Sequence, residues 1–449
     1  MNLEKKTLKN VTINEDRKLL EYFKKNVEDI KFVRKNSKMA LELIKNEIKL
    51  TLQAEPLKLL WKSMIEDAIV YLKKKDKREK YNDDLALGTK KLYDFLNEFQ
   101  KFEFLLYGAV EHYRDHLIHI FRVFLLGDYL VRESFGFDKI DVSDSVTISK
   151  EEKEAMWCIM ALTHDLGYSL QGIFKINQSV RTILQQFGAV SVQELAHSYF
   201  LQFGNISDFA LRFMSSNLIS NSDGGFFVHL QPKYYQKFMH ALSDFNHGII
   251  SSIILMKDLV FFRESDFMMD QLKALEPDDA RQFMIRREIV RAIAAHSCDD
   301  IYHLKLTNFP FLLTLVDEMQ EWGRPRLVDI TKRGDAQTEL IINEFDNKLI
   351  DYAVRFYFPS NGHLIDSEIQ NVASEVANYF ENKKNKWGNV LRSAVDGKHR
   401  NLILKFWTID NSSKKIIKYY LEHENPEKVK IETFKDFEDK QSNGPNVFL

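Results

Sequence analysis

The chain has little cysteine, proline and glycine for its length. Its 449 residues include 2 Cys, 8 Pro and 17 Gly. The two cysteines, Cys158 and Cys298, cannot build a disulfide framework, and both lie in apolar runs, so we expect two reduced, buried thiols. The scarcity of proline and glycine predicts long helices with few turns between them.

The sequence also lacks an excess of one charge and a long apolar run. Its 63 basic and 65 acidic residues leave a net charge of −2, which does not indicate a nucleic-acid partner. Composition does not reveal a local basic groove, so a nucleic-acid partner stays an open alternative. The start, MNLEKKTLKN, has charges and no apolar segment after it, so we expect no signal peptide. The strongest apolar stretch, 248–256, is far short of the about 18 residues that a membrane span needs. These features predict a cytoplasmic protein without a membrane anchor.

Composition and periodicity divide the chain into three parts. Residues 1–100 carry apolar residues at three- and four-residue spacing, which predicts an N-terminal helical segment packing on the core. Residues 101–330 predict a multi-helix domain. Residues 331–449 change to alternating and β-favouring patterns, which predict a small C-terminal α+β module. The expected fold class is therefore mainly α.

Several element boundaries can be predicted within these parts. One long helix is expected from Phe102 to Val131, and the next begins near Ser149, which forms a capping box with Glu152. A second capping box, Ser367 with Gln370, precedes another expected helix. The expected strands are 338–344, 349–358 and 401–409, while 414–421 fits either a strand or a helix.

Histidine and aspartate side chains interrupt five separate apolar runs in the middle part. Burying such groups without a partner costs several kcal/mol, so each must be hydrogen-bonded, paired or coordinated. Taken alone, each histidine fits a hydrogen-bonded core residue and the last aspartate fits a pair with an arginine. Together they supply enough ligands for one or two divalent metal ions. The six residues are His119, His164, Asp165, His247, His296 and Asp317.

The region around His119 carries an unusually polar helical face. At helical spacing, His112, Asp115, His116 and Arg122 share the face of His119. This stripe fits a metal ligand with acid/base and phosphate-binding neighbours, or alternatively a wet helix face.

The doublet His164-Asp165 ends an apolar helix in the segment ALTHDLGY. Gly167 is expected to turn the chain directly afterwards. Adjacent ligands at such a turn can hold one ion jointly. The two oxygens of the aspartate can also bridge to a second ion about 3.5–4 Å from the first.

The order and surroundings of these ligands resemble the HD-domain metal-dependent phosphohydrolase superfamily over about residues 105–325. The similar segments are HIFRV, ALTHDLGY, NHGIISS, AAH and LVDEMQEWGR. The resemblance implies a helical HD-type domain. The additional histidines, His247 and His296, are similar to the binuclear branch, which includes cyclic-nucleotide and cyclic-dinucleotide phosphodiesterases and nucleases. The mononuclear branch, with many nucleotidases and dNTP triphosphohydrolases, needs only the other ligands.

By this resemblance, one ion would be held by His119, His164, Asp165 and Asp317, and a second by Asp165, His247 and His296. Two features depart from the family pattern. Tyr168 stands where many relatives have lysine, so we expect Arg122 or Arg324 to meet phosphate charge beside Tyr168. The 45 residues from His119 to His164 imply an inserted loop around residues 133–150.

The ligand chemistry fits a catalytic site. Imidazoles and carboxylates without thiolates suit Mn, Fe, Co, Ni, Mg or Zn in an open site and not a structural zinc knot. Such ions activate water for attack on phosphorus. We count Asp165, as the bridging ligand, among the catalytic residues, together with His116 or Asp115 as the acid that protonates the leaving oxygen.

The resulting hypothesis is a metal-dependent phosphohydrolase or phosphodiesterase acting on a nucleotide-like phosphate substrate. One alternative is a regulatory HD protein that binds metal and nucleotide with little turnover. Others are an HD-type dNTP triphosphohydrolase, a nuclease, and a helical adaptor with buried polar pairs. Formation of a homo-oligomer is left open.

Overall fold

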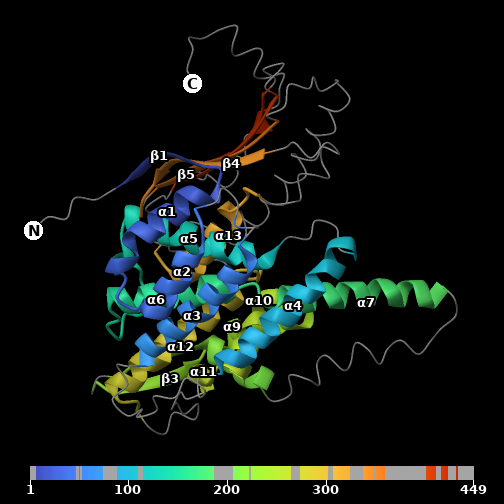
Figure 1. The fold of residues 1–449 in the computed structure, drawn as a ribbon. Helices are drawn as coiled ribbons and strands as arrows, with labels where there is room; N and C mark the ends of the chain where they lie inside the picture. Colours follow the sequence, from blue (N-terminus) through green and yellow to red (C-terminus); the bar gives the residue numbers. More distant parts are fainter. Residues whose placement is uncertain are drawn as a thin grey trace, which may run out of the picture.

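Helices form the body of the protein, and a sheet lies against one end of it (Figure 1). In this computed structural model, residues 102–109 and those from 356 onward are described by their backbone alone. The described residues are 7–46, 50, 53–73, 88–109, 115–186, 206–221, 224–263, 274–301, 307–323, 337–347, 349–358, 401–410, 416–422 and 431–432.

The expected mainly α class, with a small C-terminal module, is confirmed. The helices are α1 (Asp16–Asn26), α2 (Lys35–Leu43), α3 (Ala54–Lys73), α4 (Thr89–Ala109), α5 (His116–Glu133), α6 (Lys150–Thr163), α7 (Tyr168–Gln186), α9 (Pro232–Ser243), α10 (His247–Asp258), α11 (Val260–Arg263), α12 (Pro277–Ala295) and α13 (Phe309–Met319). Among the described residues, no helix combines the length and the apolar character that crossing a membrane requires.

Helix α6 lies at the centre of the core. It contacts α3, α5, α12 and α13, and every residue from Glu154 to Thr163 is buried. A helix that is apolar on all sides is stable only when neighbours surround it. The predicted capping box begins this helix: the Ser149 side chain accepts from the Glu152 N–H, and the Glu152 carboxylate accepts from the Ser149 N–H.

The six-stranded sheet has the order β1-β4-β5-β6-β7-β8. Its pairs are antiparallel except β5 with β6, which is parallel. The strands are β1 (Leu8–Ile13), β4 (Gln337–Phe345), β5 (Leu349–Phe358), β6 (Asn401–Asp410), β7 (Ile416–Glu422) and β8 (Ile431–Glu432). The segment that fitted strand or helix is β7, and the helix expected after Ser367 lies outside the described residues.

Two of the predictions about helices are wrong. The first is the all-helical character of residues 1–100, because Leu8–Ile13 forms β1 and pairs with β4, more than 300 residues away in the chain. Local periodicity does not show such a distant partner. The second is the single helix from Phe102 to Val131. Asp115 has an extended backbone, and its carboxylate accepts from the Ile118 N–H, so a new helix begins at His116.

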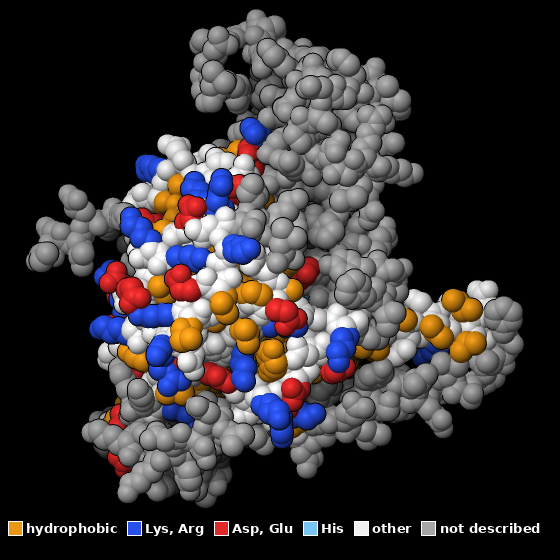
Figure 2. All heavy atoms as spheres, viewed as in Figure 1, with side chains coloured by type: hydrophobic (Ala, Val, Ile, Leu, Met, Phe, Trp, Pro, Cys, Tyr) orange, Lys and Arg blue, Asp and Glu red, His pale blue; other side chains and the backbone are white. Residues whose placement is uncertain are grey.

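Charges of both signs are intermixed on the described surface. Figure 2 shows lysine and arginine side chains next to aspartate and glutamate over the helical body, without segregation on this face. This distribution agrees with the balanced net charge. A short hairpin, β2 (Ser216–Ser220) with β3 (Phe226–Leu230), lies at the opposite end of the body from the sheet (Figure 1).

A buried ionic cluster connects α5 to α6. The guanidinium of Arg132 donates to Asp128 at 2.9 and 3.0 Å and to Glu154 at 2.8 Å. Two carboxylates therefore share one cation in the interior. Burial raises the pKa of Asp128 to about 6, although the neighbouring Arg132 opposes this rise.

The raised pKa of Asp128 predicts a pH-dependent stability. The carboxyl binds its proton more tightly in the folded than in the unfolded chain, so its stabilising contribution is complete below about pH 4 and is lost as the pH rises through about 6. Relative to Asp128→Asn, the wild type should lose roughly 3 kcal/mol of unfolding free energy over this window. Denaturant titrations at several pH values measure the difference. The control is Asp138→Asn, an exposed aspartate, and a constant difference between wild type and Asp128→Asn would contradict the prediction.

Candidate metal centre

The structure brings all six predicted metal ligands together, and we call them the His/Asp cluster. Three of its four histidines lie at helix ends. His164 is the C-cap of α6, His296 is the C-cap of α12, and His247 is the first residue of α10. His119 and Asp317 lie within α5 and α13, and Asp165 follows α6 directly.

Two glycines allow the helix ends to approach closely. A Cβ on Gly167 would lie 2.3 Å from the carbonyl oxygen of His247, and one on Gly248 would lie 2.5 Å from that of Ile293. A larger residue at either position would push α10 away from the end of α6 or from α12. Across the first contact, the Gly167 N–H donates to the Ser251 hydroxyl at 2.8 Å.

The Asp165 carboxylate lies in the middle of the cluster, with one oxygen toward each half. Its Oδ2 is 3.5 Å from Nε2 of His119 and 3.7 Å from Nε2 of His164. Its Oδ1 is 3.4 Å from Nε2 of His247 and 3.5 Å from Nε2 of His296. The residue is therefore placed to bridge two groups of ligands.

Each half is completed by a further contact. In the first half, Oδ1 of Asp317 is 2.9 Å from Nε2 of His119 and 3.9 Å from Nε2 of His164. In the second half, the Nε2 atoms of His247 and His296 are 3.2 Å apart. Both halves thus collect imidazole nitrogens and carboxylate oxygens within a few ångströms.

Each imidazole ring is oriented by an acceptor at its other nitrogen. A hydrogen-bond acceptor at Nδ1 selects the tautomer with the proton there, which leaves the Nε2 lone pair facing the cluster. The Nδ1 partners are the carbonyl oxygen of Ala161 for His164 (2.9 Å), that of Ile293 for His296 (2.6 Å), Oε1 of Gln320 for His119 (2.6 Å) and Oε1 of Gln171 for His247 (3.0 Å).

The orientation of the Gln320 amide is itself determined by a further hydrogen bond. Its Nε2 donates to the carbonyl oxygen of Trp322 at 2.8 Å, so its Oε1 faces His119. The two glutamines, Gln171 and Gln320, were not predicted as part of the site. Gln320 lies three residues after Asp317. Because glutamine is common on helices, this spacing alone does not identify it as the residue that orients the His119 ring.

In these tautomers the Nε2 lone pairs face the carboxylate oxygens, so hydrogen-bond acceptors lie next to one another with no proton between them. Nε2 of His164 is buried and has no hydrogen-bond partner among the described residues. Burial lowers the pKa of His164 to about 4, so its ring stays neutral at physiological pH. Burial by itself raises the pKa of the Asp165 carboxyl, and only positive charge at the position of the surrounding rings, His164 first, holds that pKa well below its usual range. With the rings neutral, that charge has to come from a cation. A neutral lone pair beside an ionised carboxylate is stabilised by a cation placed between them.

The spacing of the ligand atoms fits such a cation. Ions bound to imidazole and carboxylate at about 2.0–2.2 Å separate their ligand atoms by roughly 3.0–3.4 Å, and the contacts above run from 2.9 to 3.9 Å. Three groups bring their ligand atoms within 4.8 Å of one another: His119, His164 and Asp165; His164, His296 and Asp317; and Asp165, His247 and His296. The cluster could therefore hold a metal ion in either half.

Tyr168 and His116 lie beside the second half of the cluster. The Tyr168 ring is 5.2 Å from the ring of His247 and 4.2 Å from that of His116. The His247 side chain is 17% exposed, more than any other ligand of the cluster, which marks this side as the approach from solvent. The carboxylate of Asp115 instead caps α5.

Arg122 has a different environment from the predicted phosphate contact. Its guanidinium is buried and donates to both oxygens of Asp16, at 2.6 and 2.8 Å. Asp16 also accepts from the Trp322 indole at 2.9 Å. This interior ion pair joins α1 to α5 and satisfies the charge of Arg122, in place of a substrate phosphate. Arg324 and His112 lie outside the described residues.

Comparison of the chain with protein-family models, with curated proteins and with solved structures finds no match. The description of the site therefore rests on its geometry. It shows a mainly helical protein with a buried His/Asp cluster that could hold metal, an arrangement compatible with the HD type.

The second layer of support predicts a loss of metal affinity in Gln320→Leu. Removing the acceptor for Nδ1 of His119 frees the ring to rotate and to change tautomer, so the affinity for Mn²⁺ should fall about 10- to 100-fold. Isothermal titration of the metal-depleted protein measures this. The matched control is Gln282→Leu, a buried glutamine that donates to the carbonyl oxygen of Leu72. Unchanged affinity in a folded Gln320→Leu protein would refute the assigned role.

Proposed function

We propose that the protein is a metal-dependent phosphohydrolase or phosphodiesterase of the HD type, acting on a phosphate ester or anhydride of a nucleotide-like substrate. The observation that carries the proposal is the two-sided environment of Asp165. One of its oxygens faces His119 and His164, and the other faces His247 and His296. This division matches the two ligand sets that the resemblance implies.

The charge of the cluster suits a phosphate substrate. Imidazole coordinates a metal through a neutral nitrogen lone pair, so the formal charge of the metal-binding form of the cluster, −2, comes from Asp165 and Asp317. Two divalent ions would reverse that charge to +2, which attracts an anionic phosphoryl group. When bound, such ions supply Lewis acidity, which generates a nucleophile from water near neutral pH and offsets charge on the phosphoryl oxygens.

The residues around the cluster supply the remaining roles in the proposal. His247 and Tyr168 border the more exposed side, where a substrate would enter and where the phenol can donate to a phosphoryl oxygen. Of the two proposed acids, His116 is better supported than Asp115. Its ring lies 4.2 Å from the ring of Tyr168, whereas the Asp115 carboxylate is engaged as a helix cap.

A regulatory protein that binds nucleotide with little turnover is the second candidate. The observations in its favour are the neutral Tyr168, at a position where many HD relatives have lysine, and the pairing of Arg122 with Asp16. Both remove a cation that would otherwise stabilise phosphate charge during hydrolysis. Nucleotide binding without multiple turnover across several metals would favour this candidate, and multiple turnover would exclude it as the main role.

The double substitution His164→Ala with Asp165→Ala tests the proposed hydrolase. It removes ligands from both halves, so we expect metal content and phosphodiester hydrolysis to disappear while the helical circular dichroism spectrum remains. The assays use bis(p-nitrophenyl) phosphate, nucleotides, cyclic dinucleotides and dNTPs with Mn, Mg, Co and Ni.

The matched control is His240→Ala with Asp300→Ala. This exposed pair, 2.9 Å apart, has the same chemistry without belonging to the cluster, so its removal should leave both readouts unchanged. Hydrolysis at the parental rate by the His164→Ala, Asp165→Ala protein would end the hydrolase proposal.

Metal stoichiometry tests the bridging role of Asp165. If each half holds one ion, His247→Ala with His296→Ala should reduce the content from two ions to one, and Asp165→Ala should weaken both sites. The ratio of metal to protein by elemental analysis, after dialysis against Mn²⁺, measures this. A wild-type content of one ion that survives His247→Ala with His296→Ala would instead indicate a mononuclear centre.

A further inference from the structure

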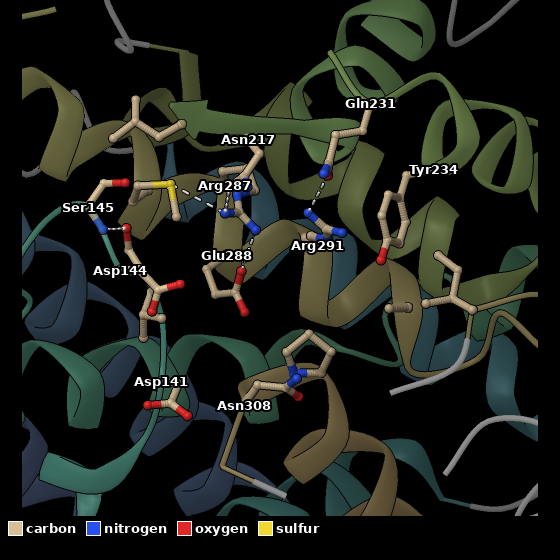
Figure 3. Close-up of a pocket in the computed structure, with 17 residues that line it drawn as sticks. Asp141, Asp144, Ser145, Asn217, Gln231, Tyr234, Arg287, Glu288, Arg291 and Asn308 are labelled. Atoms are coloured by element: carbon tan, nitrogen blue, oxygen red, sulfur yellow. Dashed lines mark hydrogen bonds and ion pairs between the residues drawn. The ribbon is translucent and has the colours of Figure 1, made fainter. Parts of the chain in front are cut away.

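A second hollow lies away from the His/Asp cluster. It has a volume of about 480 Å³ and is walled by α12, α9, β2, the loop of residues 141–145 and the beginning of α13 (Figure 3). None of the described residues that line it belongs to the cluster. Its volume lies within the range of small-molecule sites, about 300–1,000 Å³. The loop 141–145 is part of the insertion between His119 and His164.

Two arginines on successive turns of α12 line one part of this hollow. The guanidinium of Arg287 is occupied by contacts within the protein, because it donates to Glu288 at 2.6 Å and to Asn217 at 2.9 Å. Arg291 is held differently. Its guanidinium lies over the Tyr234 ring at 4.2 Å, and among the described residues its one hydrogen bond is a long contact of 3.3 Å to Gln231. Arg291 therefore presents a cation with unused donors to the hollow.

An unpaired carboxylate faces Arg291 from the opposite wall. Figure 3 shows Asp144 on one side of the hollow and Arg291 with Tyr234 on the other. Within the described part of the chain, Asp144 has neither a hydrogen bond nor an ion pair from its side chain, and it does not reach Arg291 across the gap. Two opposite charges thus remain separated by the width of the hollow.

The lining between the two charges mixes polar and apolar side chains, and the Glu288 carboxylate also faces the hollow (Figure 3). Leu218, Met284, Ile301 and Pro310 contribute to the lining, and Leu218, Met284 and Ile301 are buried core residues. A cation with unused donors and an unpaired carboxylate on opposite walls suit a small molecule that carries charges of both signs. A polyphosphate is disfavoured here, because Asp141, Asp144 and Glu288 also line the hollow and repel a multiply charged anion.

We propose that this hollow binds a small zwitterion, of which an uncapped dipeptide is the simplest class. Its carboxylate lies against the guanidinium of Arg291, and its ammonium group lies against Asp144. The loop 141–145 then contacts the ligand directly. This inference is independent of the proposed hydrolase activity, because it uses no residue of the His/Asp cluster.

Binding of uncapped dipeptides to the full-length protein tests the proposal. Leu-Leu, Val-Leu and Ala-Phe are compared with their N-acetylated and C-amidated forms by saturation-transfer NMR and isothermal titration. We expect the uncapped dipeptides to bind, and each cap to weaken binding at least about tenfold, because each removes one charge-assisted contact. Failure of all the uncapped dipeptides to bind, or equal binding of the capped forms, overturns the proposal.

Two substitutions test whether the dipeptides bind in this hollow. Arg291→Met should weaken uncapped dipeptides to the level of the C-amidated forms, and Asp144→Asn should weaken them to the level of the N-acetylated forms. The matched controls are Arg212→Met, whose guanidinium lies over Tyr235 outside the hollow, and Asp244→Asn on the surface. Binding that both Arg291→Met and Asp144→Asn leave unchanged places the ligand elsewhere and refutes the site.

Discussion

The buried carboxylate of Asp165 is the constraint on which the centre of this protein depends. A charge in the interior needs compensation, and here four imidazole rings surround it, two at each oxygen. The rings are oriented so that their lone pairs face one another and the carboxylate. This arrangement is electrostatically incomplete without protons or cations, and burial opposes protonation of His164. A buried cluster of this kind could hold a divalent metal ion.

The neighbouring helices hold α6 in place through tryptophan indoles that donate to backbone carbonyl oxygens. The indole of Trp61 on α3 donates to the carbonyl oxygen of Leu162 at 2.7 Å, just before the doublet. The indole of Trp157 donates to the carbonyl oxygen of Phe124 on α5 at 3.2 Å. Both bonds anchor α6, which delivers His164 and Asp165. The N-terminal segment contributes further through Asp16, which pairs with Arg122 one turn beyond His119.

Much of the fold and most of the candidate site could be predicted from local sequence. Apolar periodicity indicates the central helices, alternation indicates β4, β5 and β6, and the Ser149 capping box marks the beginning of α6. The six ligands were predicted because charged or polar residues in apolar runs are conspicuous. Asp115 was misread because the helical pattern continues on both sides of it, and a cap is visible only once its carboxylate bonds the Ile118 N–H.

The sequence by itself determined the helical class and the identities of the six residues of the His/Asp cluster, since both follow from residue types at short spacing. Only the tertiary structure decided which oxygen of Asp165 faces which rings, that Gln171 and Gln320 orient two of them, and that Arg122 belongs to Asp16. It also placed β1 beside β4 and formed the hollow between Asp144 and Arg291. The physical reason is that these features are contacts between residues far apart in the chain. Such contacts are selected by the packing of whole helices and strands, which local periodicity does not encode.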